Sequence, residues 1–250
     1  NFLAETLAWW DCHLKGIQNG AMDAPPLRIY LQESTTYAPY MPIVPGQWVS
    51  IKMWPPKGTS YEKVFIPIST TLESSHSVGS KKQVQDIQFS SLHGFTNFVW
   101  LSLADADFPI DQRFEDSLCA CWTTPELDED LSILGRAKLK CSVSIENSTQ
   151  GILAARLCDV SPNGKSDLMT FGVLNLTHRD GHSPDKVKDL TPGLVYKVTL
   201  NFKSVGWRVL KGHKLRLSIS SSYWPMVWTP NCKEPVKMKI HLGSDGVDSI

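Results

Sequence analysis

From residue 27 onward the sequence is divided into short runs of β-branched, aromatic and aliphatic residues, separated by Pro, Gly, Asn and Asp. This pattern is typical of strands joined by turns. The Ser-Pro-Asn-Gly stretch at 161–164 has the residue types of a tight hairpin turn. With no helical pattern between the runs, the sequence predicts an antiparallel β-sandwich. The expected strands are 27–32, 63–67, 118–123, 133–145, 152–160, 170–176, 195–201, 214–221 and 236–241.

One amphipathic helix is expected before the strands. Leu3, Leu7, Trp10 and Leu14 recur at helical spacing, and Gly16 or Gly20 can end the helix. The polar stretch 69–91, rich in Ser, Lys and Gln, is expected to be a long, mobile surface loop.

The composition narrows the function classes. The chain has 250 residues, 42% hydrophobic and 20% charged, which is typical of a folded protein rather than a disordered one. Lys and Arg total 25, as do Asp and Glu. This balance gives no electrostatic reason to expect nucleic acid or an anionic membrane as a partner. No apolar run reaches the roughly 18 residues that a membrane-spanning helix needs.

The six cysteines form no Cys-x-x-Cys pair, so the sequence predicts no structural zinc site, and we assign no metal ligand and no cofactor. Most of them stand among apolar neighbours, and we expect them to be reduced and buried. With the absence of a signal-peptide pattern, this favours a cytoplasmic location. The cysteines are Cys12, Cys119, Cys121, Cys141, Cys158 and Cys232.

A histidine and a serine cluster share the stretch "GHKLRLSISSSYWP" and raise the question of hydrolase chemistry. Leu215, Leu217 and Ile219 alternate with polar residues, so Ser218 and Ser220 lie on the opposite face of a strand. A nucleophile elbow requires Gly-x-Ser-x-Gly, which the sequence lacks. The stretch therefore predicts a Gly-His turn and a strand, and we assign no catalytic residue.

Two other clusters leave alternatives open. His178, Asp180 and His182 could hold a metal, but the segment is typical of a hydrogen-bonded loop. Several acidic residues between Asp105 and Asp116 favour a solvated or ion-paired loop, with calcium binding as the alternative.

Five stretches of the chain, in order, resemble one family. They are "AWWDCHLKGIQNGAMDAPPLRIYLQ", "WPPKGTSYEKVFI", "DQRFEDSLCACWTTPELDEDLSILG", "ARLCDVSPNGKSDLMTFG" and "PGLVYKVTLNFKSVGWRVLKGHKLRLSISSSYWP". The first resembles the end of the hydrolase domain and the start of the last domain in the cocaine esterase/X-Pro dipeptidyl-peptidase family, the CocE/NonD hydrolases. The other four resemble successive motifs of that last domain.

The resemblance implies an all-β fold, a jelly-roll, galactose-binding-like β-sandwich after one helix left over from an α/β-hydrolase domain. Residues 1–24 would be the last helix and linker of that domain, and 25–250 the C-terminal domain. The family's catalytic Ser, Asp and His lie in the hydrolase domain. The chain would then be non-catalytic alone, within a serine hydrolase of small acyl esters or X-Pro peptides.

The resemblance also implies roles for particular residues. Apolar residues before the Asp-x-Arg motif would form the rim of the acyl pocket, or else be core strand positions. These rim candidates are Trp100, Leu101, Leu103 and Phe108. Asp111 and Arg113 would form a structural ion pair that fixes this loop.

Trp9 and Trp10 would serve the interface with the α/β-hydrolase domain of the same parent chain. Two alternatives remain. The chain could be a stand-alone carbohydrate- or ligand-binding jelly roll, using its nine Trp residues as aromatic platforms. It could also be a purely structural domain that forms homo-oligomers.

Overall fold

The computed structural model describes residues 2–35, 43–60, 83–95 and 111–242. The chain divides into two compact units. One consists of residues 1–31 and 47–61, and the other of 32–46 and 62–250. The expected domain boundary after residue 24 stays a prediction.

The first unit holds the expected N-terminal helix, α1 (Phe2–Lys15). Glu5 in its first turn and Lys15 in its last match the helix dipole. The helix ends before Gly16, whose φ of 69° lies in the left-handed region that favours glycine. No α1 side chain is buried. The other elements are η1 (Ala21–Asp23), most of β1 (Leu27–Glu33), and β2 (Gly46–Ile51), which neighbours β1.

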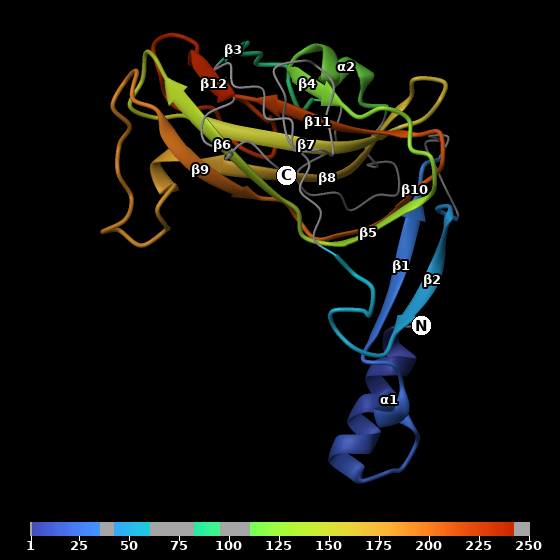
Figure 1. The fold of residues 1–250 in the computed structure, drawn as a ribbon. Coiled ribbons are helices and arrows are strands. Elements are labelled where there is room, and N and C mark those ends of the chain that lie inside the picture. The colour runs from blue at the N-terminus through green and yellow to red at the C-terminus, as the bar shows by residue number, and fades with distance from the viewer. Residues whose placement is uncertain (1, 36–42, 61–82, 96–110, 243–250) are drawn as a thin grey trace. The chain divides into compact units, whose positions relative to one another are not determined.

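The second unit is a sandwich of two four-stranded antiparallel sheets (Figure 1). One sheet has the order β4-β11-β7-β8 and the other β3-β12-β6-β9. Their inner faces form one apolar core, to which β7 contributes Leu153 and β6 contributes Leu139, both fully buried. The bounds are β3 (Gln83–Ile87), α2 (Arg113–Ser117), β4 (Ala120–Thr123), β5 (Leu131–Gly135), β6 (Lys138–Ile145), β7 (Ile152–Val160), β8 (Ser166–Asn175), η2 (Leu176–His178), β9 (Tyr196–Asn201), β10 (Val205–Val209), β11 (Lys214–Ser220) and β12 (Met238–Leu242).

The expected sandwich and two expected turns are confirmed. In the β7–β8 turn, Gly164 has φ 85° and its N–H donates to Ser161 O at 2.8 Å. Gly212, with φ 80°, occupies the turn before β11. Both turns need a backbone conformation that glycine adopts without a steric penalty.

One strand pairing departs from the expected antiparallel pattern. Gln32 and Glu33, at the end of β1, pair in parallel with Trp207 and Arg208 of β10. Strand β10 in turn pairs antiparallel with β5. Arg208 joins Glu33 at 3.0 Å and Asp130 at 2.7 Å, so charged side chains reinforce this edge.

Other expectations are corrected. Residues 83–87, expected within a mobile loop, form β3 because β12 offers them an edge to pair with. The expected single strand 133–145 is two strands, since Gly135 with φ 126° interrupts it. The elements β2, β10 and α2 were not expected. Residues 69–82 and the expected strand 63–67 lie outside the described residues. None of the described helices is long and apolar enough to cross a membrane.

Candidate functional site

The polar face of β11 is buried, although its residue types suggest exposure. Leu217 and Ile219 point into the sandwich core. On the other face, Ser218 and Ser220 are only 1% and 2% exposed. Helix α2 and the segment 90–95 contact this face through side-chain hydrogen bonds. The serines therefore belong to a buried polar layer outside the main apolar core.

Arg156 of β7 is the centre of one network in this layer. Its guanidinium donates from Nη2 to Asp116 Oδ1 at 2.9 Å and from Nη1 to Gln112 Oε1 at 2.8 Å. Arg216 Nη1 donates to Asp116 Oδ2 at 2.8 Å, and Ser218 Oγ donates to Asp116 Oδ1 at 3.0 Å. Asp116 and its neighbour Glu115 were expected in a solvated or ion-paired loop; Asp116 is ion-paired, but both residues are buried and lie in α2. The cause is the buried guanidinium of Arg156, whose charge compensates the Asp116 carboxylate.

A second network has the residue types of a catalytic triad. His93 Nδ1 lies 3.0 Å from Ser220 Oγ, and His93 Nε2 lies 3.8 Å from Glu115 Oε2. The three residues come from the segment before residue 96, from β11 and from α2. A Ser–His–acid set in this order would warrant a test for general-base geometry.

The hydrogen bonds exclude a nucleophile–base role for this pair. His93 Nδ1 lies 2.6 Å from the main-chain oxygen of Ser222. A carbonyl oxygen only accepts, so Nδ1 carries the proton and cannot take one from Ser220. Ser220 Oγ itself donates to Ser222 O at 2.8 Å. Burial, with the nearby Arg156 charge, lowers the pKa of His93 to about 4, so the ring is neutral at pH 7.

His213, the histidine nearest to the serine cluster in sequence, belongs to a third buried network. Its Nδ1 lies 2.7 Å from Asp159 Oδ1, and Trp207 Nε1 donates to Asp159 Oδ2 at 2.9 Å. Burial raises the pKa of Asp159, against the hydrogen bonds from Trp207 and His213. The carboxylate thus ties β7 to β10 and to the turn before β11.

Replacing Asp159 with asparagine is expected to lower the free energy of unfolding by about 1–3 kcal/mol, because the amide can accept from only one of the two buried donors. Urea unfolding followed by tryptophan fluorescence would measure the change. Asp180→Asn is the matched control, since its side chain is largely exposed. Equal stability of the two variants would contradict the structural role of Asp159.

The chain is held firmly just before residue 96. Gly94 N–H donates to Glu115 Oε2 at 2.6 Å, and Trp224 N–H donates to His93 O at 2.9 Å. Gly94 has φ 99°, and a Cβ at this position would collide with the main-chain oxygen of Trp224. This close approach requires glycine.

The chain is also held just after residue 110. Asp111 forms an ion pair with Arg113, Oδ2 to Nη2 at 2.7 Å, and its Oδ1 accepts from the N–H of Ser166 at 3.2 Å. Gln112 N–H donates to Ser166 O at 2.8 Å. The pair expected at Asp111 and Arg113 is therefore present, while its role in fixing the rim loop stays a prediction. The four rim candidates Trp100, Leu101, Leu103 and Phe108 lie outside the described residues.

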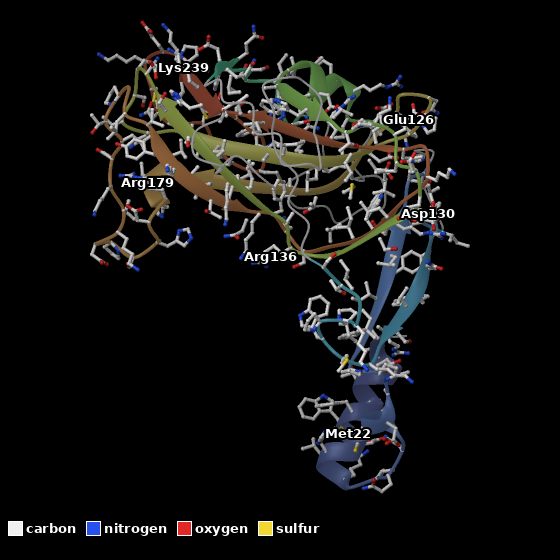
Figure 2. All side chains as sticks on the ribbon, in the orientation of Figure 1. Met22, Glu126, Asp130, Arg136, Arg179 and Lys239 are labelled. Atoms are coloured by element: carbon white, nitrogen blue, oxygen red, sulfur yellow. The ribbon has the colours of Figure 1, made fainter. Side chains whose placement is uncertain are left out.

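Arg179, which is labelled in Figure 2, binds main-chain oxygens on both sides of the histidine cluster after β8. The Arg179 guanidinium donates to Leu176 O and Lys188 O and lies 4.5 Å from the centroid of the Tyr196 ring. His178 and His182 approach each other at 3.1 Å between their Nδ1 atoms. Of the two alternatives for this segment, a metal site and a hydrogen-bonded loop, these contacts support the loop.

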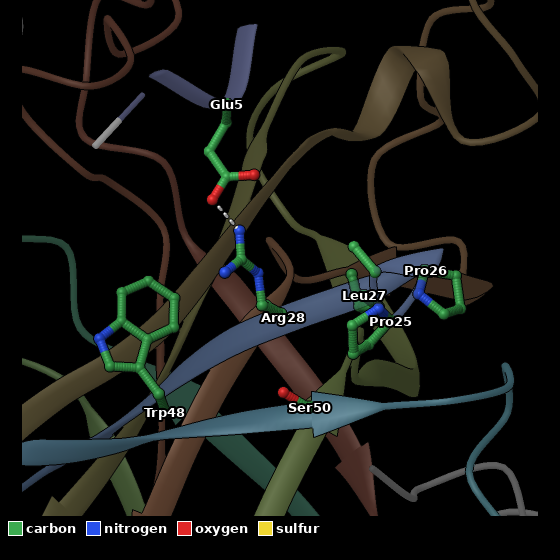
Figure 3. Close-up of a pocket in the computed structure, with 8 residues that line it drawn as sticks. Glu5, Pro25, Pro26, Leu27, Arg28, Trp48 and Ser50 are labelled. Atoms are coloured by element: carbon green, nitrogen blue, oxygen red, sulfur yellow. Dashed lines mark hydrogen bonds and ion pairs between the residues drawn. The ribbon is translucent and has the colours of Figure 1, made fainter. Parts of the chain in front are cut away.

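In the first unit, a surface pocket is lined by residues of α1, β1 and β2 and the segment before β1 (Figure 3). Glu5 and Arg28 form an ion pair there, and the Arg28 hydrogen bond lowers the pKa of Glu5. The Trp48 ring packs edge-on against Tyr30. The two charges in the lining thus neutralise each other. Trp9 and Trp10 of α1 are 48% and 51% exposed.

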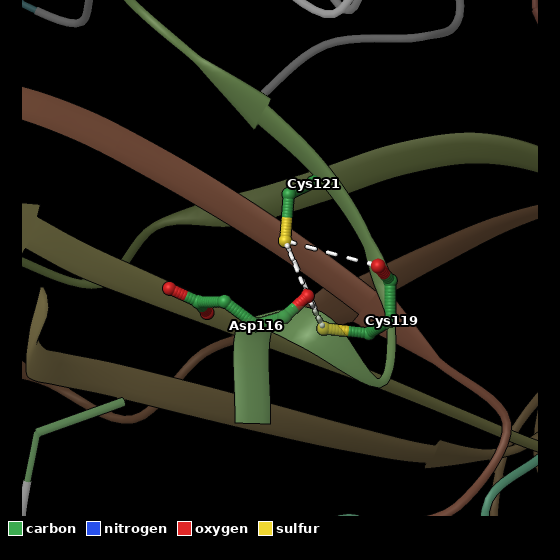
Figure 4. A group of neighbouring side chains, drawn as sticks. All are labelled: Asp116, Cys119 and Cys121. Carbon is green, nitrogen blue, oxygen red and sulfur yellow. Dashed lines mark hydrogen bonds between the residues drawn. The ribbon is translucent and has the colours of Figure 1, made fainter. Parts of the chain in front are cut away.

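All six cysteines are thiols, as expected, but only Cys141 and Cys158 are buried. Cys12 and Cys232 are half-buried, as are Cys119 and Cys121. Among the described residues, a carboxylate oxygen of Asp116 and the sulfur atoms of Cys119 and Cys121 lie within 4.8 Å of one another; Figure 4 shows these three residues. The sequence pointed away from such a group, because the two cysteines are separated by one residue rather than two.

The sandwich belongs to a known class of domain. Residues 19–241 match the family described as the X-Pro dipeptidyl-peptidase C-terminal non-catalytic domain. The chain belongs to this family.

Relatives and solved structures are similar to this chain over most of its length. The cocaine esterase of Rhodococcus sp. is 22% identical over 233 residues, covering 87% of this chain and 38% of the esterase. A CocE/NonD family hydrolase from Staphylococcus aureus shares the fold, with a TM-score of 0.72 at 15% identity, covering 99% of this chain and 44% of that one. An alpha-amino acid ester hydrolase gives a TM-score of 0.73 at 18% identity, covering 97% and 42%. The chain therefore spans less than half the length of these proteins.

Proposed function

We propose that this chain is the C-terminal domain of a serine hydrolase that cleaves small acyl esters or X-Pro peptides. In this proposal the domain packs on an α/β-hydrolase domain and shapes its substrate pocket, and it performs no chemistry alone. The observation that carries the proposal is the match of residues 19–241 to a family of non-catalytic C-terminal domains. The esterase relative named above, which is more than twice as long, gives further support.

The buried networks support a non-catalytic role. Ser220 and His93 have the residue types for nucleophilic chemistry, but each is at most 2% exposed. The proton on His93 Nδ1 also points to a carbonyl oxygen rather than leaving a lone pair for the serine. A substrate carbonyl would have to reach a serine that the protein covers.

The apolar surface of α1 supports packing on a partner domain. Phe2, Leu3, Leu7 and Leu14 are each at least 60% exposed, and Trp9 and Trp10 stand beside them on the same helix. A helix that exposes this many large apolar side chains is typical of an interaction surface. We assign the α/β-hydrolase domain of the same parent chain as its partner.

The anchored ends of the segment 96–110 support the proposed rim. The chain before this segment is bound to Glu115, and the chain after it is bound to Ser166. Fixed positions on both sides of residues 96–110 would lower the entropic cost of presenting Trp100, Leu101, Leu103 and Phe108 to an acyl group. This arrangement would let a non-catalytic domain influence substrate choice.

The first test is ester turnover by the 250-residue chain. With p-nitrophenyl acetate we expect no turnover above a denatured control, and the same result for Ser218→Ala and Ser220→Ala. Turnover that either substitution abolishes would overturn the proposal. In the complete gene product, we expect the sequence before residue 1 to contain Gly-x-Ser-x-Gly and a histidine. A gene product without them would also overturn the proposal.

A second test addresses the rim in the complete gene product. Trp100→Ala and Leu103→Ala are expected to raise KM for bulky acyl esters more than for acetyl esters, because they remove apolar contact area from the pocket. Leu194→Ala, at an exposed position in the loop before β9, is the control. Identical changes in all three variants would argue against a rim. Calcium-dependent retention on an insoluble polysaccharide would instead favour the carbohydrate-binding alternative.

A further inference from the structure

Two thiols converge on one main-chain oxygen at the junction of α2 and β4. Cys119 and Cys121 Sγ are 3.8 Å apart. Both thiols lie within hydrogen-bond reach of Asp116 O, at 3.6 Å for Cys119 and 3.3 Å for Cys121. Figure 4 shows this oxygen between the two sulfur atoms, with the Asp116 carboxylate directed away from them.

These three distances match one face of a tetrahedral zinc site. Zinc binds thiolate sulfur at about 2.3 Å and oxygen at about 2.0–2.2 Å, so tetrahedral angles place two sulfurs about 3.8 Å apart and a sulfur and an oxygen about 3.5 Å apart. We propose that Cys119, Cys121 and the main-chain oxygen of Asp116 form a site for a thiophilic divalent cation such as zinc. A water molecule completes the four ligands.

The neighbouring charges allow a cation here. On binding, a divalent ion replaces the protons of two neutral thiols, so the net charge of the cluster does not change. Both thiol protons are lost, including that of Cys119, whose nearest acceptor is Glu115 O at 3.1 Å, and Asp116 O keeps a lone pair for the ion. The charges of Arg156 and Arg216 stay paired with the Asp116 carboxylate.

The surrounding side chains would hold the sulfur ligands in place. Arg156 Nη2 donates to Cys119 Sγ at 3.3 Å, which stabilises a thiolate at that position. Ser218 Oγ lies 3.3 Å from Cys121 Sγ. Such outer hydrogen bonds orient ligands and tune metal sites. The bound ion would join α2 to β4, just after the segment 96–110, and this inference does not depend on the proposed hydrolase function.

The test is a titration of the reduced chain with cobalt(II), a spectroscopic substitute for zinc. We expect one equivalent to bind with a thiolate-to-cobalt band in the near ultraviolet and the visible bands of tetrahedral cobalt. Zinc should displace the cobalt, and binding should release two protons per ion. The absence of these bands would overturn the proposal, as would bands typical of an octahedral ion.

Cysteine-to-serine variants would identify the sulfur ligands of the proposed cation site. Cys119→Ser and Cys121→Ser are each expected to abolish the thiolate band, while Cys232→Ser should keep it. Cys232 is also half-buried but contacts Ser148 rather than the pair. Circular dichroism would show whether the variants fold. If they do not, X-ray absorption on the zinc-loaded unmodified chain decides: two sulfur ligands at about 2.3 Å support the site, and none or four overturn it.

Discussion

Replacing Arg156 with methionine is expected to lower the free energy of unfolding by about 3–5 kcal/mol, because it leaves a buried carboxylate short of its main partner. Arg156 is 1% exposed, and its guanidinium binds both Asp116 and Gln112. Methionine keeps much of the volume of the side chain and removes the charge. Urea unfolding at pH 7, followed by tryptophan fluorescence, would measure the loss.

Arg113→Met is the matched control. Arg113 also pairs with an aspartate, but its side chain is 63% exposed. An exposed pair of this kind contributes about 0–1 kcal/mol. If the two methionine variants lose similar stability, the Arg156 network is not the buried anchor described above. Adding Asp116→Leu to Arg156→Met should recover part of the loss, since removing both charges is less costly than leaving one.

Acidification from pH 6.5 to pH 4 is expected to cost about 3 kcal/mol of stability through His93 alone, at about 1.4 kcal/mol for each pKa unit. Burial lowers the pKa of His93 to about 4 from an ordinary value of 6.5. Between these values the unfolded chain binds a proton that the folded chain does not. The contribution of His93 to the free energy of unfolding is therefore fully present above pH 6.5 and is lost as the pH falls toward 4.

His93→Asn isolates this contribution. The asparagine Nδ2 can replace Nδ1 as a donor to Ser222 O, while the titration is removed. The unfolding free energy of the variant should fall by about 3 kcal/mol less than that of the unmodified chain over the same pH range. If the unfolding free energies of the two proteins changed equally with pH, His93 would already be protonated in the folded chain at pH 6. That result would contradict a neutral ring bound to Ser222 O through Nδ1.

Both predictions concern the same piece of the molecule. Arg156 holds α2 through Asp116, and Glu115 of α2 holds the chain before residue 96 through Gly94. Destabilising either network would loosen both ends of the segment that we propose as the pocket rim. In the complete gene product, Arg156→Met is therefore expected to affect substrate KM as well as stability.

The sequence alone determined the class of fold and the family. Strand β11 was predictable because Leu215, Leu217 and Ile219 alternate with polar residues. The β7–β8 hairpin was predictable because Pro162, Asn163 and Gly164 suit a tight turn. Local backbone preferences carry both signals, so no knowledge of distant residues is needed.

The tertiary structure alone decided which polar residues are buried. Asp116 lies in an acidic stretch that is typical of a solvated or ion-paired loop, and helix α2 is too short to show a helical period. Strand β3 is mostly polar and becomes a strand because β12 pairs with it. The partners of Asp116, namely Arg156, Arg216 and Ser218, are at least 40 residues away in sequence. A charge is stable in the interior only when such partners are assembled, and only the folded chain assembles them.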